Sequence, residues 1–272
     1  MAHLQLGQSN AGLLRTASNL ADRFHAAVIG IAVSQPTPNL YCDNGYSYTS
    51  GDIVVAEREE IDAETAAAEA EFRGALQAHA GSIEWRSAVI SGSLSRYLAD
   101  QARGADMVIT GVSPAMWLDP SRHLDAADLI MRAGRPVLIV PPTANALRLE
   151  RIVVGWKDAR EARRAALDAL PVLKLARYVA VVEIANDADL GAARVRLDDV
   201  VAWLRGHGVA ATPIAAAACG SDAAHLNEIV QRQGADLIVA GAYGHNRLQE
   251  WALGGVTRDL LLCADRCALV SH

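Results

Sequence analysis

The stretch Gln101-Ala-Arg-Gly-Ala-Asp-Met-Val-Ile-Thr-Gly111 returns 130 residues later as Gln231-Arg-Gln-Gly-Ala-Asp-Leu-Ile-Val-Ala-Gly241. Five of the eleven positions are identical, and three others are aliphatic in both copies. Each copy is typical of a helix end, a glycine stop, an acidic residue and a buried strand, in that order. Because internal repeats define the architecture of a chain, this pair indicates that one structural unit occurs twice.

The duplication extends beyond this stretch. Upstream, Ser91-Gly-Ser93 matches Cys219-Gly-Ser221 at an offset of 128, and downstream Arg135–Val140 matches Arg266–Ser271 at 131. The chain has 272 residues, which at about 150 residues per domain leaves room for two copies. Pro141 and Pro142 cannot continue the strand before them and favour a connector between two domains. We therefore expect domains over residues 1–143 and 149–272.

Apolar runs and helical patterns alternate through both copies. In the second copy we predict strands over 151–155, 178–184, 209–217, 237–240 and 268–270, and helices over 161–174, 192–207 and 223–233. In the first copy we predict strands over 26–33, 85–90 and 107–110, and helices over 53–80 and 94–103. Strands that are apolar on both faces and alternate with helices form parallel sheets covered on both sides. The predicted fold class is therefore α/β, with two tandem Rossmann-like, doubly wound, mainly parallel five-stranded domains.

Two irregularities mark the first copy. Residues 35–52 are rich in Pro, Gly, Asn and Ser, which predicts a long loop without a counterpart in the second copy. The first strand is short, because only His3–Leu6 precedes Gly7. Either the fold tolerates a truncated strand or the natural start lies further upstream, and we favour the second.

Charge and composition argue against several classes of protein. The net charge of −6 and the absence of a basic run argue against nucleic acid as a partner. No apolar run is long enough for a membrane span, and the first residues do not form a signal peptide, so we expect a soluble, cytoplasmic protein without a membrane partner. The four cysteines show no CxxC pattern and the eight histidines no HExxH pattern, so we expect buried thiols and no metal site. Glutamates between Glu57 and Glu71 indicate a solvated helix face.

A glycine pattern follows the strand predicted at 237–240. Gly241 and Gly244 precede Gly254 by the spacing Gly-x2-Gly-x9-Gly, and Gly255, Val256 and Thr257 then open a helical stretch. Ligands of open parallel sheets bind beyond the carboxyl ends of the strands, and free N–H groups at a helix start bind anions. The pattern suits phosphate binding. A tight turn before a helix cap would use the same glycines for geometry alone.

With these residues, the chain resembles a tandem universal stress protein. The resemblance rests on the stretch from Gly234 to His245, on the glycine spacing and on the final Cys-Ala-Leu-Val strand. The plan of five strands and four helices in each half covers nearly the whole chain. It implies a Rossmann-like nucleotide-binding fold, ATP as the ligand in some members, and dimers or pseudo-dimers formed through the last strand. The binding residues expected on this basis are Gly241, Gly244, Gly254, Gly255, Val256, Thr257, His245 and Asp158.

Several positions depart from the family pattern. Gly255 stands where the family has Ser or Thr, and Lys157 stands where it has an acid, with Asp158 one residue later. Lys157 could meet a phosphate or simply be solvated, and His245 could equally be a surface residue. After Gly111 the first copy has no second glycine, so it resembles a domain that kept the fold and lost the nucleotide loop.

We therefore expect a universal stress protein that binds an adenine nucleotide in the second domain, with the first domain as its pseudo-dimer partner and a homodimer as a further option. A nucleotide-free interaction module is the alternative. No Walker-type GxxxxGK[ST] loop or nucleophile–base pair is present, so no catalytic residue is predicted and ATP hydrolysis would be weak at most.

Overall fold

The computed structural model describes residues 1–36, 51–111, 124–144, 147–242 and 266–272. Its strands form one sheet in the order β3-β2-β1-β4-β5-β10-β9-β6-β7-β8. The strands of the N-terminal half are β1 (Ala2–Leu4), β2 (Ala27–Ser34), β3 (Ser82–Val89), β4 (Val108–Gly111) and β5 (Val137–Val140). Those of the C-terminal half are β6 (Arg151–Gly155), β7 (Tyr178–Ala185), β8 (Ala211–Ala217), β9 (Leu237–Gly241) and β10 (Cys267–Ser271).

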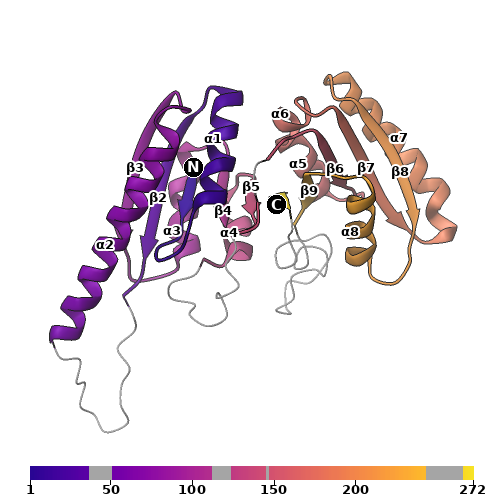
Figure 1. Cartoon of the computed structure of the whole chain (residues 1–272). Coiled ribbons are helices and arrows are strands. Elements are labelled where there is room, and N and C mark those ends of the chain that lie inside the picture. The colour runs from indigo at the N-terminus through magenta and orange to yellow at the C-terminus, as the bar shows by residue number, and fades with distance from the viewer. Residues whose placement is uncertain (37–50, 112–123, 145–146, 243–265) are drawn as a thin grey trace, which may run out of the picture.

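The two halves repeat one topology. Numbered within its own half, each set of strands runs 3-2-1-4-5, and every neighbouring pair inside a half is parallel. The fold class predicted from the sequence is confirmed. The halves lie side by side and meet at their last strands (Figure 1).

The joint between the halves is the one antiparallel pair of the sheet as described. Val137, Leu138 and Ile139 of β5 lie opposite Val270, Leu269 and Ala268 of β10. All of these side chains are buried. Each half thus covers the strand edge that the other would otherwise expose.

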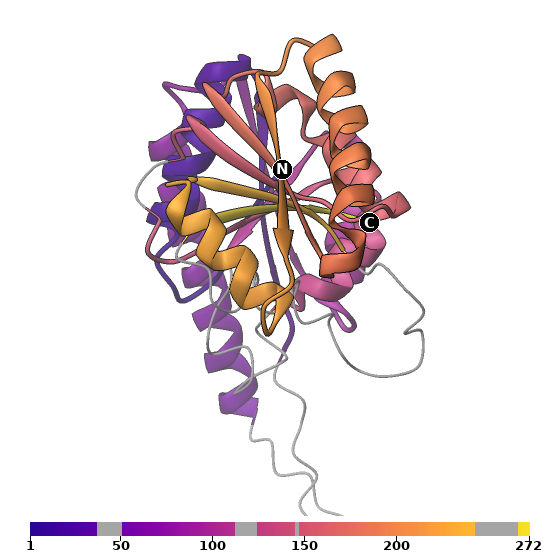
Figure 2. The same ribbon diagram turned by 90° about the vertical axis from the view of Figure 1, so that its right-hand side faces the viewer.

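Helices cover both faces of the sheet. In the N-terminal half they are α1 (Ala11–Phe24), α2 (Gly51–Leu76), α3 (Leu94–Gln101) and α4 (Ala126–Ala133). In the C-terminal half they are α5 (Arg160–Asp168), α6 (Leu170–Leu173), α7 (Leu190–Gly206) and α8 (Asp222–Arg232). Figure 2 shows α7 and α8 on opposite sides of the C-terminal half.

The core is divided by the sheet. One apolar cluster contains side chains of α1, α2, α5 and α7 together with Ile152 and Val154 of β6, and a second one joins α8 to Val153. Successive residues of a strand point to opposite faces, so β6 contributes to both clusters. A buried aliphatic strand of this kind belongs at the centre of a doubly wound sheet.

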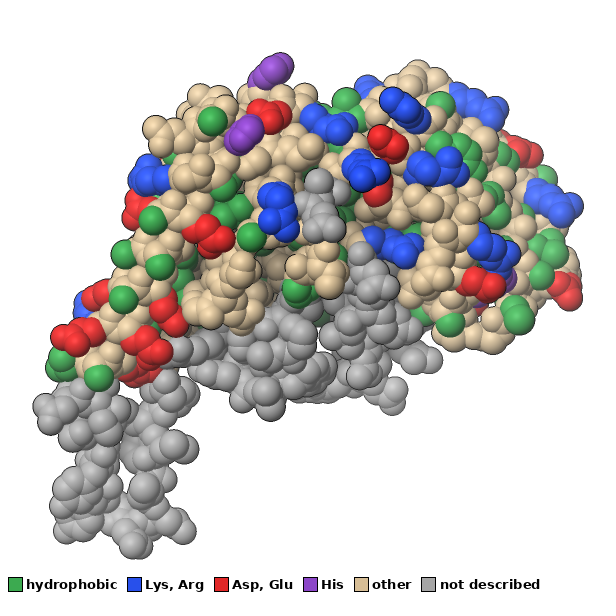
Figure 3. All heavy atoms as spheres, viewed as in Figure 1, with side chains coloured by type: hydrophobic (Ala, Val, Ile, Leu, Met, Phe, Trp, Pro, Cys, Tyr) green, Lys and Arg blue, Asp and Glu red, His purple; other side chains and the backbone are tan. Residues whose placement is uncertain are grey.

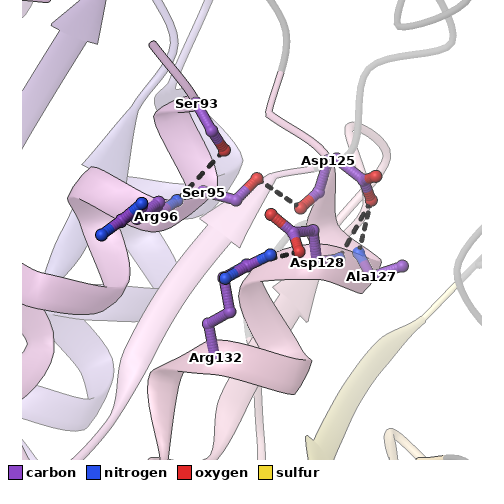
Figure 4. Close-up of polar contacts among 7 residues, drawn as sticks. All are labelled: Ser93, Ser95, Arg96, Asp125, Ala127, Asp128 and Arg132. Atoms are coloured by element: carbon purple, nitrogen blue, oxygen red, sulfur yellow. Dashed lines mark hydrogen bonds and ion pairs between the residues drawn. The ribbon is translucent and has the colours of Figure 1, made fainter.

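The helices α3 and α4 are held by side-chain caps. The carboxylate of Asp125 accepts hydrogen bonds from Ala127 N and Asp128 N at 2.9 and 3.1 Å, and the hydroxyl of Ser95 donates to the Asp125 carbonyl at 3.0 Å (Figure 4). The Ser93 hydroxyl caps α3 by accepting from Arg96 N. These bonds satisfy N–H groups that have no partner within the helix and tie the two helices together.

Three expectations need correction or comment. The helix predicted over 161–174 is two helices, α5 and α6, because Pro171 has no N–H to continue the hydrogen-bond ladder. Of the thiols that the structure describes, Cys267 is buried as predicted but Cys219 is exposed. The first strand is short, as expected, and pairs in parallel with β2 and β4 over its few residues.

The acidic face predicted on the long helix of the N-terminal half is confirmed. Glu59, Glu60 and Asp62 of α2 are exposed, and Figure 3 shows acidic side chains gathered along this helix. Lys and Arg side chains are spread over the C-terminal half in the same view. Within the described ranges, no helix combines the length and apolar character needed to cross a bilayer.

Candidate nucleotide site

The strands β6 and β9 lie next to each other at the centre of the C-terminal half. The chain leaves β6 toward α5 on one face of the sheet, whereas it enters β9 from α8 on the other face. The connections therefore diverge between these two strands. In open α/β sheets the crevice at such a switch point, beyond the carboxyl ends of the strands, is where ligands bind.

Two of the predicted site residues lie at the two strand ends that form this edge. Gly241 is the last residue of β9, and Asp158 is an exposed residue of the loop after β6. Gly244, His245, Gly254, Gly255, Val256 and Thr257 lie outside the described residues. Of the predicted set, the structure therefore brings Gly241 and Asp158 to one edge of the sheet.

Gly241 lies against the first turn of α5. A Cβ added to it would be 2.5 Å from the carbonyl carbon of Glu161 and 2.6 Å from the nitrogen of Ala162. These are backbone atoms, which cannot move aside as a flexible side chain can. The absence of a side chain at Gly241 is required for close packing of helix on strand, whatever ligand the edge receives.

Glu161 places a carboxylate at the same edge. Its side chain is 9% exposed, and Oε1 accepts a hydrogen bond from Arg160 Nε at 2.6 Å. Burial alone would raise the pKa of Glu161, but the hydrogen bond from Arg160 and its charge hold the pKa below the usual value. Glu161 is therefore ionised at neutral pH. An acidic residue in the first turn of a helix was the one sequence signal that could have drawn attention to it.

Lys157 is a further cationic residue at this edge, beside Arg160. It follows Trp156, whose backbone N–H donates to the Val182 carbonyl at 2.7 Å and so continues the β6–β7 ladder. Lys157 is exposed, and its carbonyl accepts from Ala159 N at 2.6 Å in a tight turn into α5. The neighbouring Asp158 forms an ion pair with Arg163, one turn into the helix.

The chain's last residues support the start of the segment after β9. Ala242 N donates to the Ser271 carbonyl at 2.8 Å, and the Ala242 carbonyl lies 3.2 Å from Nδ1 of His272. Sequence reasoning did not identify His272. Its role depends on β10 lying beside β9, which no local pattern reveals.

The corresponding edge of the N-terminal half is closed by polar side chains. Gln5 Nε2 donates to the Gly111 carbonyl at 3.3 Å and thereby joins the segment after β1 to the end of β4. Asn10 closes the same loop by accepting from Gln5 N and donating to the carbonyls of Gln5 and Gln8. The crevice between β1 and β4 is thus bridged by the protein itself.

A buried histidine lies just behind this bridge. His3 Nδ1 lies 2.9 Å from the Thr110 hydroxyl, and burial lowers the pKa of His3 to about 4. His3 lies opposite Thr110 in the same way that Gly155 lies opposite Ala240 in the other half. A neutral side chain therefore occupies the place that a glycine has in the C-terminal half. Within the described part of the chain, no cluster of three or more His, Cys, Asp or Glu side chains is placed to hold a metal ion.

Comparison with solved structures identifies the fold. A universal stress protein from Archaeoglobus fulgidus DSM 4304 matches 99% of this chain and 97% of its own with a TM-score of 0.73 at 15% identity. A functionally unknown protein from Pseudomonas aeruginosa PAO1 matches 99% of this chain and 91% of its own with a TM-score of 0.65 at 16% identity. A putative universal stress protein from Pseudomonas aeruginosa UCBPP-PA14 matches 94% of this chain and 95% of its own, with a TM-score of 0.55 and 15% identity.

No protein-family model and no curated protein matches the sequence. The structural likenesses nevertheless extend over both halves. The chain has the fold of these universal stress protein structures, as the sequence resemblance led us to expect.

Proposed function

We propose that the protein is a cytoplasmic universal stress protein that binds one adenine nucleotide, ATP, at the carboxyl edge of its C-terminal half. The observation that carries the proposal is the divergence of the chain connections at β6 and β9, which brings Lys157 and the start of the glycine-rich segment to the same edge. We propose binding without dedicated catalytic machinery. The protein would report or buffer nucleotide rather than turn it over.

In this proposal the phosphates are held mainly by backbone amides. Gly244, Gly254 and Gly255 allow close approach of the chain, Val256 contributes its N–H, and Thr257 and His245 add polar side chains. Lys157 supplies a positive charge from the end of the neighbouring strand β6, and Asp158 is available for the sugar hydroxyls. No metal site of the protein's own is part of the proposal.

The N-terminal half serves as the partner within the chain. Its crevice is bridged by Gln5 and Asn10, so we propose a single nucleotide per chain. Its contribution is the strand β5, which completes the sheet next to β10. This is the arrangement of a dimer built into one polypeptide.

Isothermal titration of the full chain with ATP tests the proposal. We expect one nucleotide per chain, and Lys157→Gln should weaken binding severalfold because it removes a charge from the phosphate edge. Lys174→Gln is the matched control, since Lys174 is exposed and lies just before β7, at the opposite edge of the sheet. Absence of any binding at millimolar ATP would refute the nucleotide proposal.

A second candidate is a nucleotide-free interaction module. The carboxylate of Glu161 favours it, because a negative charge at this edge, even one paired with Arg160, opposes the binding of a triphosphate. Glu161→Gln separates the candidates. If ATP binds at this edge, neutralising Glu161 should tighten binding, whereas a nucleotide-free module should bind no ATP with either residue.

A further inference from the structure

The sheet ends at two outer strands, β3 in the N-terminal half and β8 in the C-terminal half (Figure 1). Within the residues that the structure describes, each of them has a strand neighbour on one side only. An outer strand presents backbone N–H and C=O groups that can pair with another strand, so proteins usually protect such edges. The two edges of this sheet differ in that protection.

The outer edge of β8 is protected over the first part of the strand. Ala218 N donates to the Ala185 carbonyl of β7 at 2.8 Å, so the even-numbered residues of β8 turn their backbone groups toward β7 and the odd-numbered residues turn theirs outward. Among the outward residues, Pro213 has no N–H to offer. The Ala211 carbonyl already accepts hydrogen bonds from Nε and Nη2 of Arg205, at 3.2 and 2.9 Å. This edge is therefore poorly suited to receive another strand.

The outer edge of β3 shows neither form of protection among the described residues. Ile90 N donates to the Ser34 carbonyl of β2 at 2.9 Å, so the even-numbered residues of β3 turn their backbone groups toward β2. Ile83, Trp85 and Ser87 therefore direct their N–H and C=O groups outward, and each of them retains its N–H because none is a proline. A strand added at this edge would meet a regular row of donors and acceptors.

Two charged side chains of β3 indicate which strand would fit. Glu84 and Arg86 are two residues apart and so lie on the same face of the strand, where Arg86 Nε donates to Glu84 Oε1 at 2.7 Å. Their side chains are 55% and 33% exposed. Arg86 Nη1 also donates to Gln101 Oε1 of α3 at 3.0 Å, which holds the guanidinium in place. A guanidinium has five N–H groups, so Arg86 can bind a second carboxylate as well.

An acid and a base two residues apart make β3 complementary to itself. If two β3 strands pair antiparallel about a two-fold axis at Trp85, Glu84 of each copy lies opposite Arg86 of the other. Ile83 of one copy then lies opposite Ser87 of the other, so outward backbone groups also meet outward backbone groups. Moving the register by two residues in either direction places two glutamates or two arginines opposite each other, which is unfavourable. Only the register centred on Trp85 places opposite charges opposite each other.

We propose that the outer edge of β3 binds a second copy of this chain, which pairs antiparallel through its own β3 and continues the sheet from one chain into the next. This surface is distinct from the pairing of β5 with β10, which lies within one chain. Trp85 packs on Phe72 of α2 with ring centroids 5.6 Å apart, and in the pair it lies opposite Trp85 of the second copy, which adds an aromatic cross-strand pair. The proposal does not depend on nucleotide binding.

Sedimentation equilibrium of the full chain, without added nucleotide, tests the proposal. We expect a monomer–dimer equilibrium, and Glu84→Arg should weaken the association about tenfold or more because it places two arginines opposite each other on both sides of the axis. Arg86→Glu should have the same effect through two opposed glutamates. Arg232→Glu is the matched control, since Arg232 also forms an exposed ion pair, with Glu228, but belongs to α8 of the other half. This control should associate as the wild-type chain does.

Mixing the two charge variants separates recognition from a loss of folding. An equimolar mixture of Glu84→Arg and Arg86→Glu should form heterodimers although each variant alone associates weakly. In the mixture the introduced arginine lies opposite the introduced glutamate, and the native Arg86 of one variant lies opposite the native Glu84 of the other. Circular dichroism verifies that both variants are folded. Folded variants that remain monomeric when mixed would overturn the proposed register.

A backbone variant tests the strand pairing itself. Ser87→Pro removes one outward N–H without changing the charge, as Pro213 does in β8, and should also weaken the association about tenfold or more. A wild-type chain that stays monomeric up to roughly 1 mM would overturn the proposal. So would dimers that Glu84→Arg and Ser87→Pro both leave unchanged, because those dimers would form through another surface. Since association is measured without nucleotide, a failed ATP titration would leave this outcome unaffected.

Discussion

Gly241 and Glu161 are in backbone contact: the end of β9 packs so closely on the first turn of α5 that a single added carbon at Gly241 would lie 2.5 Å from the Glu161 carbonyl carbon. The repeat provides the counterpart, because Gly111 ends β4 as Gly241 ends β9. At Gly111 the nearest atoms of the described residues to an added Cβ belong to the Gln5 side chain, at 3.8 Å. Two glycines that are equivalent in sequence thus have different structural roles.

Gly241→Ala should therefore destabilise the protein by about 2–3 kcal/mol, because helix and strand must move apart. Gly111→Ala should change the free energy of unfolding by less than about 0.5 kcal/mol, since there is room for the methyl group. Urea denaturation of both variants measures the difference. Equal effects would show that the packing at Gly241 does not limit stability.

His3 should make stability pH-dependent. Its pKa is lowered from 6.5 to about 4 by burial, so the unfolded chain binds a proton at this site more readily than the folded chain does. The contribution of His3 is fully present above pH 6.5 and is lost as the pH falls from 6.5 to 4, by roughly 3 kcal/mol in all.

His3→Asn, which can still hydrogen-bond to Thr110 but does not titrate, should flatten the curve in this range. The measurement is the free energy of unfolding at several pH values between 7 and 4 for both proteins. Parallel curves would mean that His3 is not the residue responsible.

Leu138 should matter to both halves because it lies in the joint. It is 1% exposed and lies opposite Leu269, which is equally buried. Leu138→Ala should cost about 3 kcal/mol through the cavity it leaves. Leu175→Ala, at a 39% exposed position, should cost much less.

The shared sheet also predicts how unfolding proceeds. Circular dichroism and tryptophan fluorescence should give coincident transitions for the wild-type chain, because β5 and β10 join the two halves in one sheet. Two separated transitions, only one of them shifted by Leu138→Ala, would contradict this.

Asp125→Ala should destabilise the protein by about 1 kcal/mol, because the N-terminal N–H groups of α4 lose their cap. Asp125→Asn retains an acceptor oxygen and should be nearly neutral. Thermal unfolding of the two variants provides the measurement. A full loss of stability in Asp125→Asn would indicate that charge, and not the hydrogen bonds, matters here.

The sequence alone was sufficient to predict the strands and strand ends that recur in both halves. The offset between Gly111 and Gly241 identified equivalent strand ends, and the apolar runs identified the strands around them. These features follow from periodicity within a short window, so one sequence is enough to read them. The resemblance to universal stress proteins added the expectation of a joint between last strands.

What the sequence did not reveal depends on contacts between distant segments. The packing of Glu161 against Gly241 and the contact of His272 with Ala242 require knowledge of which strands are neighbours. The break at Pro171 could have been predicted, since proline was visible within the proposed helix.

The antiparallel joint of β5 and β10 has an evolutionary consequence. Two separate subunits with identical sequences must change together, so a substitution that alters one crevice alters both. Fusion removes that constraint and fixes the stoichiometry at one to one. One copy can then acquire polar bridges such as Gln5 to Gly111 across its own crevice, while still supplying the strand β5 to the joint.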